Sequence, residues 1–188
     1  MEQPKTRLAM HPKKFALWLF IVSITMMFMA WTSAFLVKAA DGFNQDLSMP
    51  ILFTVSTVII ALSSVTMQLA QRGSKKDELS TTKTMLILTM VLAVAFLVIQ
   101  VKGWDQLVML NHHFVGNDAI ASFIYVLTGM HGLHIVSGMI FLLITLYATY
   151  NYKVHSKSMV LIQMCTTYWH FLGGLWIYLF LFLTVNLN

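Results

Sequence analysis

The chain has 188 residues, of which 58% are hydrophobic and only 10% are charged, and its mean hydropathy is +0.74. Soluble globular domains carry about 25% charged residues, so this composition excludes an ordinary soluble protein and indicates one that crosses a membrane repeatedly. The single cysteine, Cys165, excludes an internal disulfide.

Five apolar segments are each long enough to cross a bilayer, which takes about 20 helical residues. None of them contains Asp, Glu, Lys or Arg. We therefore expect an all-α fold, a single integral-membrane domain over residues 1–188 built as a bundle of five transmembrane helices. In chain order the predicted helices span roughly residues 15–37, 49–70, 84–101, 120–147 and 159–185.

The first two segments begin close to a proline, Pro12 and Pro50, where the missing N–H costs little. The first segment follows a basic N-terminus, as a signal peptide does. However, it is longer than the apolar part of a signal peptide, and no small-residue cleavage site follows it. We expect it to be a permanent transmembrane helix.

The basic residues predict how the bundle is oriented. The N-terminus and the second and fourth links together carry ten Lys and Arg residues, whereas the first and third links carry only Lys38 and Lys102. The positive-inside rule then places the N-terminus in the cytoplasm and the C-terminus in the periplasm. The basic residues are thereby explained as topology signals and anchors for anionic lipid, so the net charge of +5 does not indicate a nucleic-acid partner.

Three histidines lie within the last two segments. His131 and His134 are three residues apart and share one helix face, and His170 lies in the last segment. His131 and His170 are each about 16 Å from one end of their helices, and all three histidines therefore lie near the middle of the membrane. Three imidazoles at one depth can bind a metal or haem, but no carboxylate in the segments could orient such ligands. We therefore favour hydrogen bonds between helices, or to lipid, over a metal site. The adjacent pair His112 and His113 falls in a polar link and is expected to be solvated.

Small residues are frequent in the same two segments and indicate close packing between the last two helices or against a partner subunit. The glycines concerned are Gly129, Gly132, Gly138, Gly173 and Gly174. Ion-coupled transporters usually carry a carboxylate inside a span, and none is present in these five segments. We predict no catalytic, cofactor-binding or metal-binding residue in this chain.

Two late motifs resemble subunit III of haem-copper respiratory oxidases. Thr128-Gly-Met-His-Gly-Leu-His134 with Gly138 resembles its TG-x-HG-x-H-V-x-x-G segment, and Tyr168-Trp-His-Phe171 with Trp176 resembles YWHFVD-x-x-W. Weaker matches appear earlier and in the same order. They are Leu17–Phe20 with Ser23, Ser63-Ser64 with Gln68 and Ala70, and Phe96-Leu97 with Gln100 and Trp104. The resemblance covers nearly the whole chain and is to the short, five-helix bacterial form.

The chain departs from the family pattern at three positions. Ile24, Gly103 and Gly173 stand where the family carries carboxylates. The family's proposed role in collecting protons relies partly on such acids, so that role is not carried over to any residue here. Groups on another subunit that replace them would not be visible in this sequence.

The resemblance implies a non-catalytic accessory subunit III of a bacterial haem-copper terminal oxidase in the inner membrane. Such a complex reduces O₂ to water with electrons from cytochrome c, or from quinol, and pumps protons. Its haem and copper would belong to the partners, the catalytic subunit I and the copper-centre subunit II, while this chain would hold structural phospholipid. Membership of a larger respiratory supercomplex stays open. The residues expected to make lipid contacts or polar contacts between helices are His131, His134, Trp169 and His170.

Other functions remain compatible with the sequence. Within the family, the chain would also suit a quinol oxidase or an accessory protein of nitric oxide reductase. From a different class, a stand-alone haem- or metal-binding membrane protein would use His131, His134 and His170 as ligands. Such a protein would show a haem spectrum or bound metal when purified alone.

Overall fold

The fold is described from a computed structural model, which defines residues 12–40, 51–109, 119–152, 154 and 158–187. It contains five long helices that are each long and apolar enough to cross a membrane. They are α1 (Pro12–Ala40), α2 (Ile51–Lys75), α3 (Leu79–Met109), α4 (Ala119–Tyr150) and α5 (Val160–Leu187). The predicted bundle of five transmembrane helices is thus confirmed.

The helices run further than the predicted spans. The link predicted at residues 71–83 is almost entirely helical, because α2 continues to Lys75 and α3 already begins at Leu79. Likewise, α3 continues to Met109 rather than ending at residue 101. Hydropathy marks only the part of a helix inside hydrocarbon, whereas Arg, Lys and Gln are good helix formers that extend it into the polar layer. At the short turn between α2 and α3, Asp77 adopts a φ of 58°, a conformation that Asp tolerates better than most residues.

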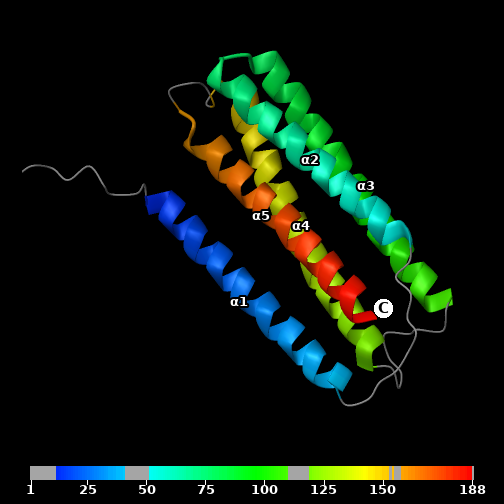
Figure 1. The fold of residues 1–188 in the computed structure, drawn as a ribbon. Helices are drawn as coiled ribbons and strands as arrows, with labels where there is room; N and C mark the ends of the chain where they lie inside the picture. The colour runs from blue at the N-terminus through cyan, green and yellow to red at the C-terminus, as the bar shows by residue number, and fades with distance from the viewer. Residues whose placement is uncertain (1–11, 41–50, 110–118, 153, 155–157, 188) are drawn as a thin grey trace, which may run out of the picture.

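Consecutive helices run in opposite directions, so that the start of α1, the α2–α3 turn and the start of α5 lie at one end (Figure 1). α2 and α3 pack against each other along their length, and α4 and α5 lie beside them. α1 packs only against α4 and α5, on the side away from α2 and α3. The bundle is therefore a packed unit of four helices with α1 attached to one flank.

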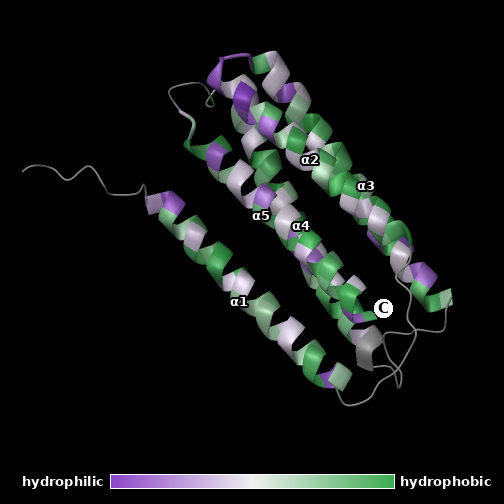
Figure 2. Ribbon diagram, in the orientation of Figure 1, coloured by the Kyte–Doolittle hydropathy of each residue, from purple (hydrophilic) through white to green (hydrophobic). Residues whose placement is uncertain are grey.

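Apolar residues cover most of the length of every helix, and polar residues gather towards the ends (Figure 2). The core is nevertheless rich in aromatic side chains. Phe96 packs edge-on against Trp176 with ring centroids 5.1 Å apart, and Phe53 stacks on the same indole at 6.1 Å. Large apolar side chains are also exposed on the outer faces, as expected of helices that face lipid tails.

Aromatic contacts attach α1 to its neighbours. Phe28 is buried and packs edge-on against both His131 and His134 of α4, with centroid distances of 6.5 and 5.7 Å. Two turns further along the same face, Phe35 is fully buried between Phe123 of α4 and Phe182 of α5. These rings hold a helix that has few other neighbours.

Candidate functional site

Two tryptophans connect α5 to α2 inside the membrane. The indole N–H of Trp169 donates to the Ser63 hydroxyl over 3.1 Å, and that of Trp176 donates to the Thr57 hydroxyl over 3.0 Å. The indoles are seven residues apart and lie on the same side of α5. Both are buried, where an N–H without an acceptor would be costly. These two bonds therefore fix the register of α5 against α2.

Two further bonds connect α4 to its neighbours. The hydroxyls of Ser137 in α4 and Tyr168 in α5 are 2.7 Å apart. On the other side, the indole of Trp104 in α3 donates to the Thr128 hydroxyl over 2.9 Å. Hydrogen bonds between membrane helices contribute about 0.6 kcal/mol on average, and up to about 1.7 kcal/mol. The motif residues around His131 are therefore joined to both neighbouring helices by specific polar contacts.

His131 is enclosed in the core of the bundle. Its ring centroid lies 5.1 Å from that of Trp176 and 5.9 Å from that of Phe96, and the side chain is 0% exposed. Neither ring nitrogen hydrogen-bonds to a residue that the structure describes. The imidazole is therefore held by aromatic packing rather than by a hydrogen bond.

A second buried polar group is incompletely bonded. The side-chain amide of Gln100 in α3 donates to Ser56 of α2 over 3.4 Å, but its buried Oε1 has no hydrogen bond within the described residues. On the same helix, Phe96 packs on His131 and Trp104 bonds to Thr128. α3 therefore makes polar contacts with both α2 and α4.

The other two histidines have different surroundings. The Nδ1 atom of His134 is 2.7 Å from the backbone carbonyl of Met130 in its own helix. His170 lies on α5, where its Nε2 is 3.0 Å from Oε1 of Gln68 in α2. His134 therefore faces α1 through Phe28, whereas His170 faces α2.

This arrangement separates the histidines that a metal or haem site would need to combine. His131 and His134 both contact Phe28, but His170 pairs with α2. Within the described part of the chain, no three His, Cys, Asp or Glu side chains lie close enough to hold a metal ion. His112 and His113 lie outside the described residues. Cys165 is a buried free thiol.

The five glycines named from the sequence occupy unlike positions. A Cβ atom at Gly138 would lie 2.9 Å from Cδ1 of Leu172, and one at Gly173 would lie 3.0 Å from Oγ of Ser64. These two sites allow α4 and α2 to approach α5. A Cβ atom would make only ordinary contacts, at 3.8 to 3.9 Å, at Gly129 and Gly132, and would meet nothing within 4 Å at Gly174.

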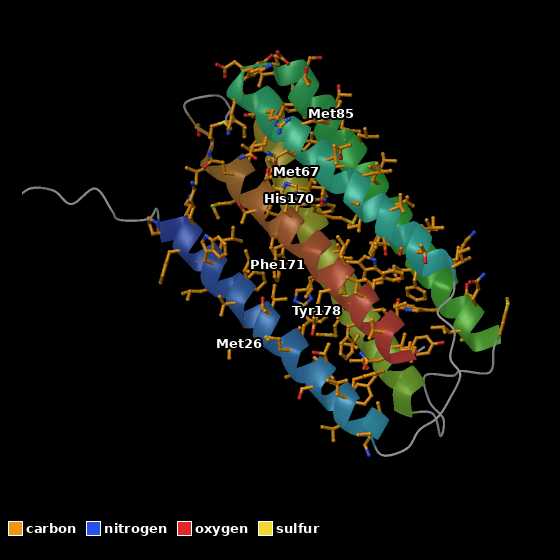
Figure 3. All side chains as sticks on the ribbon, viewed as in Figure 1. Met26, Met67, Met85, His170, Phe171 and Tyr178 are labelled. Carbon is orange, nitrogen blue, oxygen red and sulfur yellow. The ribbon has the colours of Figure 1, made fainter. Side chains whose placement is uncertain are left out.

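Pockets lie on two sides of α5, towards α1 and towards α2. Along the boundary with α1 is an apolar pocket of about 360 Å³, and a second pocket of about 280 Å³, lined by both polar and apolar residues, lies towards the start of both helices. Along the boundary with α2 is another pocket of about 280 Å³, which His170 helps to line. In Figure 3, Phe171 and Tyr178 lie on the α5 surface beside α1, and His170 lies towards α2.

The sequence did not reveal the acceptors for these indoles and imidazoles. The acceptors are Ser63, Thr57 and Gln68. In the sequence, only their polarity inside an apolar segment indicated that they would need hydrogen-bonding partners. Which of the many Ser and Thr residues would pair depends on helix rotation and register, and these are settled by packing between segments far apart in the chain.

The chain matches a model of the family described as cytochrome c oxidase subunit III over residues 3–186. It is 26% identical to the cytochrome bo(3) ubiquinol oxidase subunit 3 of Buchnera aphidicola subsp. Schizaphis graminum, covering 93% of this chain and 94% of that protein. It is also 26% identical to cytochrome c oxidase subunit 3 of Alkalihalophilus pseudofirmus, over 87% of this chain and 81% of the relative. For the subunit 3 of Thermostichus vulcanus the identity is 26%, with 93% and 89% covered.

These matches span all five helices and include both motifs that carry the histidines. The expected resemblance is confirmed, and the relatives include both cytochrome c and ubiquinol oxidase subunits. The chain belongs to the cytochrome c oxidase subunit III family, the third subunit of haem-copper respiratory oxidases.

Proposed function

We propose that this chain is a non-catalytic subunit that packs beside the catalytic subunit I and the copper-centre subunit II and holds a phospholipid between α1 and α5. The haem and copper of the complex would belong to those partners. The complex would lie in the bacterial inner membrane, with the N-terminus of this chain in the cytoplasm. The ten-to-two distribution of Lys and Arg supports this orientation.

The observation that carries the lipid proposal is the pair of pockets along the α1–α5 boundary. The first is lined by the polar side chains of Lys14, Gln71 and Gln163 together with apolar ones, and the ammonium group of Lys14 donates to the Gln163 carbonyl oxygen over 2.7 Å. A lysine and two amides are suitable donors for a phosphate headgroup. Because this end carries the basic residues, the headgroup would lie in the cytoplasmic leaflet.

The second pocket suits an acyl chain. Its lining is almost wholly apolar and includes Phe28, Met29, Phe171 and Leu175. It begins at Thr25, eleven residues along α1 from Lys14, which corresponds to about 16 Å of helix. Half of a bilayer's hydrocarbon core is about 15 Å thick. A headgroup at Lys14 would therefore bring the ends of its acyl chains to the beginning of this apolar pocket.

Phospholipid content of the purified complex tests the lipid site. We expect Lys14→Ala to lower the number of retained phospholipids by about one per complex. Lys13→Ala is the matched control, since it removes the same charge from an exposed neighbour that does not line the pocket. Equal lipid content in both variants and the wild type would contradict the proposed site.

Affinity purification in mild detergent tests the accessory role. The chain is expected to recover a large haem-bearing subunit and a copper-centre subunit. Haem absorption should stay with those partners when this chain is stripped off. Recovery of the chain alone with its own haem or metal would instead support a stand-alone binding protein with His131, His134 and His170 as ligands.

A further inference from the structure

A further hollow of about 510 Å³, here called the α2–α3 hollow, lies beside the turn that joins α2 to α3. This turn is at the same end of the bundle as the start of α1 (Figure 1). The hollow is lined by one face of α2, one face of α3 and the turn between them. It shares no lining residue with the pockets between α1 and α5 or between α2 and α5.

The spacing of residues along the chain brings the lining together. Leu69 and Arg72 of α2 are three residues apart and share a face of the helix, as do Thr81 and Met85 of α3, which are four residues apart. Because α2 and α3 run in opposite directions and pack along their length, these faces form two walls of one hollow.

The turn that closes the hollow is fixed by backbone contacts. The carbonyl oxygen of Gly73 accepts from the backbone N–H groups of Lys76 and Glu78, each over 3.0 Å. A Cβ atom at Gly73 would lie 3.0 Å from Oγ1 of Thr82, so the glycine allows α2 and α3 to come close. The lining is therefore carried by a short hydrogen-bonded turn, and a ligand would not need to order a loop on binding.

Basic and apolar side chains line the hollow at different depths. Arg72, Lys75 and Lys76 are exposed and lie at the end of α2. Leu69 is six residues before the end of α2 and Met85 is six residues after the start of α3, which places both about 9 Å further into the bundle. Figure 2 shows hydrophilic residues at the turn and hydrophobic ones along the helices beyond it, and Figure 3 shows Met85 on α3. This is the order of a phospholipid, with a charged headgroup above acyl chains.

The charge of the lining selects the kind of headgroup. With three basic side chains and the carboxylate of Glu78, the hollow carries a formal net charge of +2. A guanidinium binds phosphate through paired hydrogen bonds, and basic pockets between membrane helices bind anionic headgroups. Basic residues that serve only as topology signals can extend to water separately. Here they surround one hollow that also contains apolar residues.

We propose that the α2–α3 hollow binds an anionic phospholipid. Its phosphate would lie among Arg72, Lys75 and Lys76, and an acyl chain would lie against Leu69 and Met85. This lipid is additional to the one proposed between α1 and α5 and lies on the other flank of the bundle. The site requires the membrane-spanning fold but not the accessory role.

Native mass spectrometry of the full-length chain in mild detergent tests the site. Every protein carries Lys14→Ala, so that the proposed site between α1 and α5 does not contribute. Adding Arg72→Gln and Lys76→Gln is expected to weaken phosphatidylglycerol binding about 25-fold, because each basic residue near a membrane surface contributes about fivefold. Binding of zwitterionic phosphatidylcholine should change little. Arg72→Lys with Lys76→Arg keeps both charges and should retain most of the affinity.

The matched control for charge is the pair Lys13→Gln and Lys102→Gln. Both lysines are exposed, and neither lines the hollow. This pair removes the same net charge as the Arg72 and Lys76 pair, so unchanged binding of phosphatidylglycerol is expected. An equal loss in both pairs would show attraction by the overall charge and would overturn the site.

A second measurement distinguishes a lipid from a soluble anion. Leu69→Ser alters an exposed position and should weaken binding of phosphatidylglycerol, because the acyl chain loses an apolar contact. Glycerophosphoglycerol, which is the same headgroup without acyl chains, should bind far more weakly than the lipid. If it binds equally well, or if Leu69→Ser has no effect on the lipid, the hollow is a site for water-soluble phosphates and the lipid proposal is wrong.

Discussion

The indole of Trp169 on α5 donates to the hydroxyl of Ser63 on α2 over 3.1 Å, although the two residues are 106 positions apart in the chain. Both side chains are fully buried. In water such a bond would compete with solvent, but inside a bilayer the only alternatives are other protein groups. The contact therefore helps to fix the register of α5 against α2, together with the bond between Trp176 and Thr57.

We expect Trp169→Phe and Ser63→Ala to be energetically coupled. Each variant removes one partner of the bond, so the double variant should be more stable than the sum of the single losses suggests, with a coupling of about 0.6 to 1.7 kcal/mol. Unfolding of the full chain by SDS in mixed micelles measures these free energies. Trp18→Phe, at an exposed position on α1, serves as the control for loss of an indole. A coupling close to zero would mean that the bond does not stabilise the fold.

His131 offers a different test, because its ring is packed among aromatics without a hydrogen bond to any described residue. We expect His131→Ala to lower the free energy of unfolding by about 2–4 kcal/mol, through the cavity that it leaves. His131→Leu fills most of that space and removes a polar group whose burial costs about 1–3 kcal/mol, so its stability should equal or exceed that of the wild type. Unfolding by SDS measures both free energies. If His131→Leu lost as much stability as His131→Ala, the imidazole would have a hydrogen-bonding partner. The haem spectrum of the complex should change in neither variant.

Gly138 and Gly174 are expected to respond oppositely to the same change. A Cβ atom at Gly138 would lie 2.9 Å from Leu172 and 3.2 Å from the ring of Trp169, so Gly138→Ala should push α4 from α5 and cost about 1–3 kcal/mol. At Gly174 the space is open, and Ala should add up to about 1 kcal/mol through its higher helix propensity. Unfolding of the isolated chain by SDS compares the two, because in the complex the proposed lipid would lie beside Gly174. Equal effects would show that the α4–α5 spacing is not set at Gly138.

Phe28→Ala should loosen α1 without unfolding the other helices. The ring packs on both His131 and His134 and is among the few contacts that attach α1. Its loss should lower the free energy by about 3–5 kcal/mol, and most of this loss should fall on the opening of α1 rather than on unfolding of the other helices. Hydrogen exchange is therefore expected to rise in α1 and to stay unchanged in α2 and α3. Met26→Ala is the control, because this side chain projects away from the bundle in Figure 3 and is largely exposed. A uniform rise in every helix would show that the five helices unfold as one unit.

The number and order of the helices could be predicted from the sequence because a spanning segment is a local property, an apolar run of sufficient length. Helix ends were less accessible. Arg72 and Lys75 continue α2 beyond the apolar run, because Arg and Lys are good helix formers although they are hydrophilic. Predictions from hydropathy therefore found the part of each helix inside the bilayer and missed the turns outside it.

The inward faces were harder to predict. In a soluble helix an apolar stripe marks the buried side, but α4 and α5 are apolar on all sides and carry no such mark. His131 and His134 could be assigned to one helix face, yet their spacing did not show that one would be enclosed by Trp176 and Phe96. Nor could the pairing of His170 with Gln68 be derived, because it depends on how α5 is rotated against α2.

The attachment of α1 has a consequence for biosynthesis. α1 is made first, but the partners of Lys14 and Thr32 are Gln163 and Tyr178, which are 149 and 146 residues later in the chain. During synthesis α1 therefore faces lipid until α4 has been made, and its polar contacts with α5 form only after the last helix has been inserted. When α1 finally closes against α4 and α5, a lipid molecule already lying beside it can be enclosed at the boundary without having to enter a finished protein.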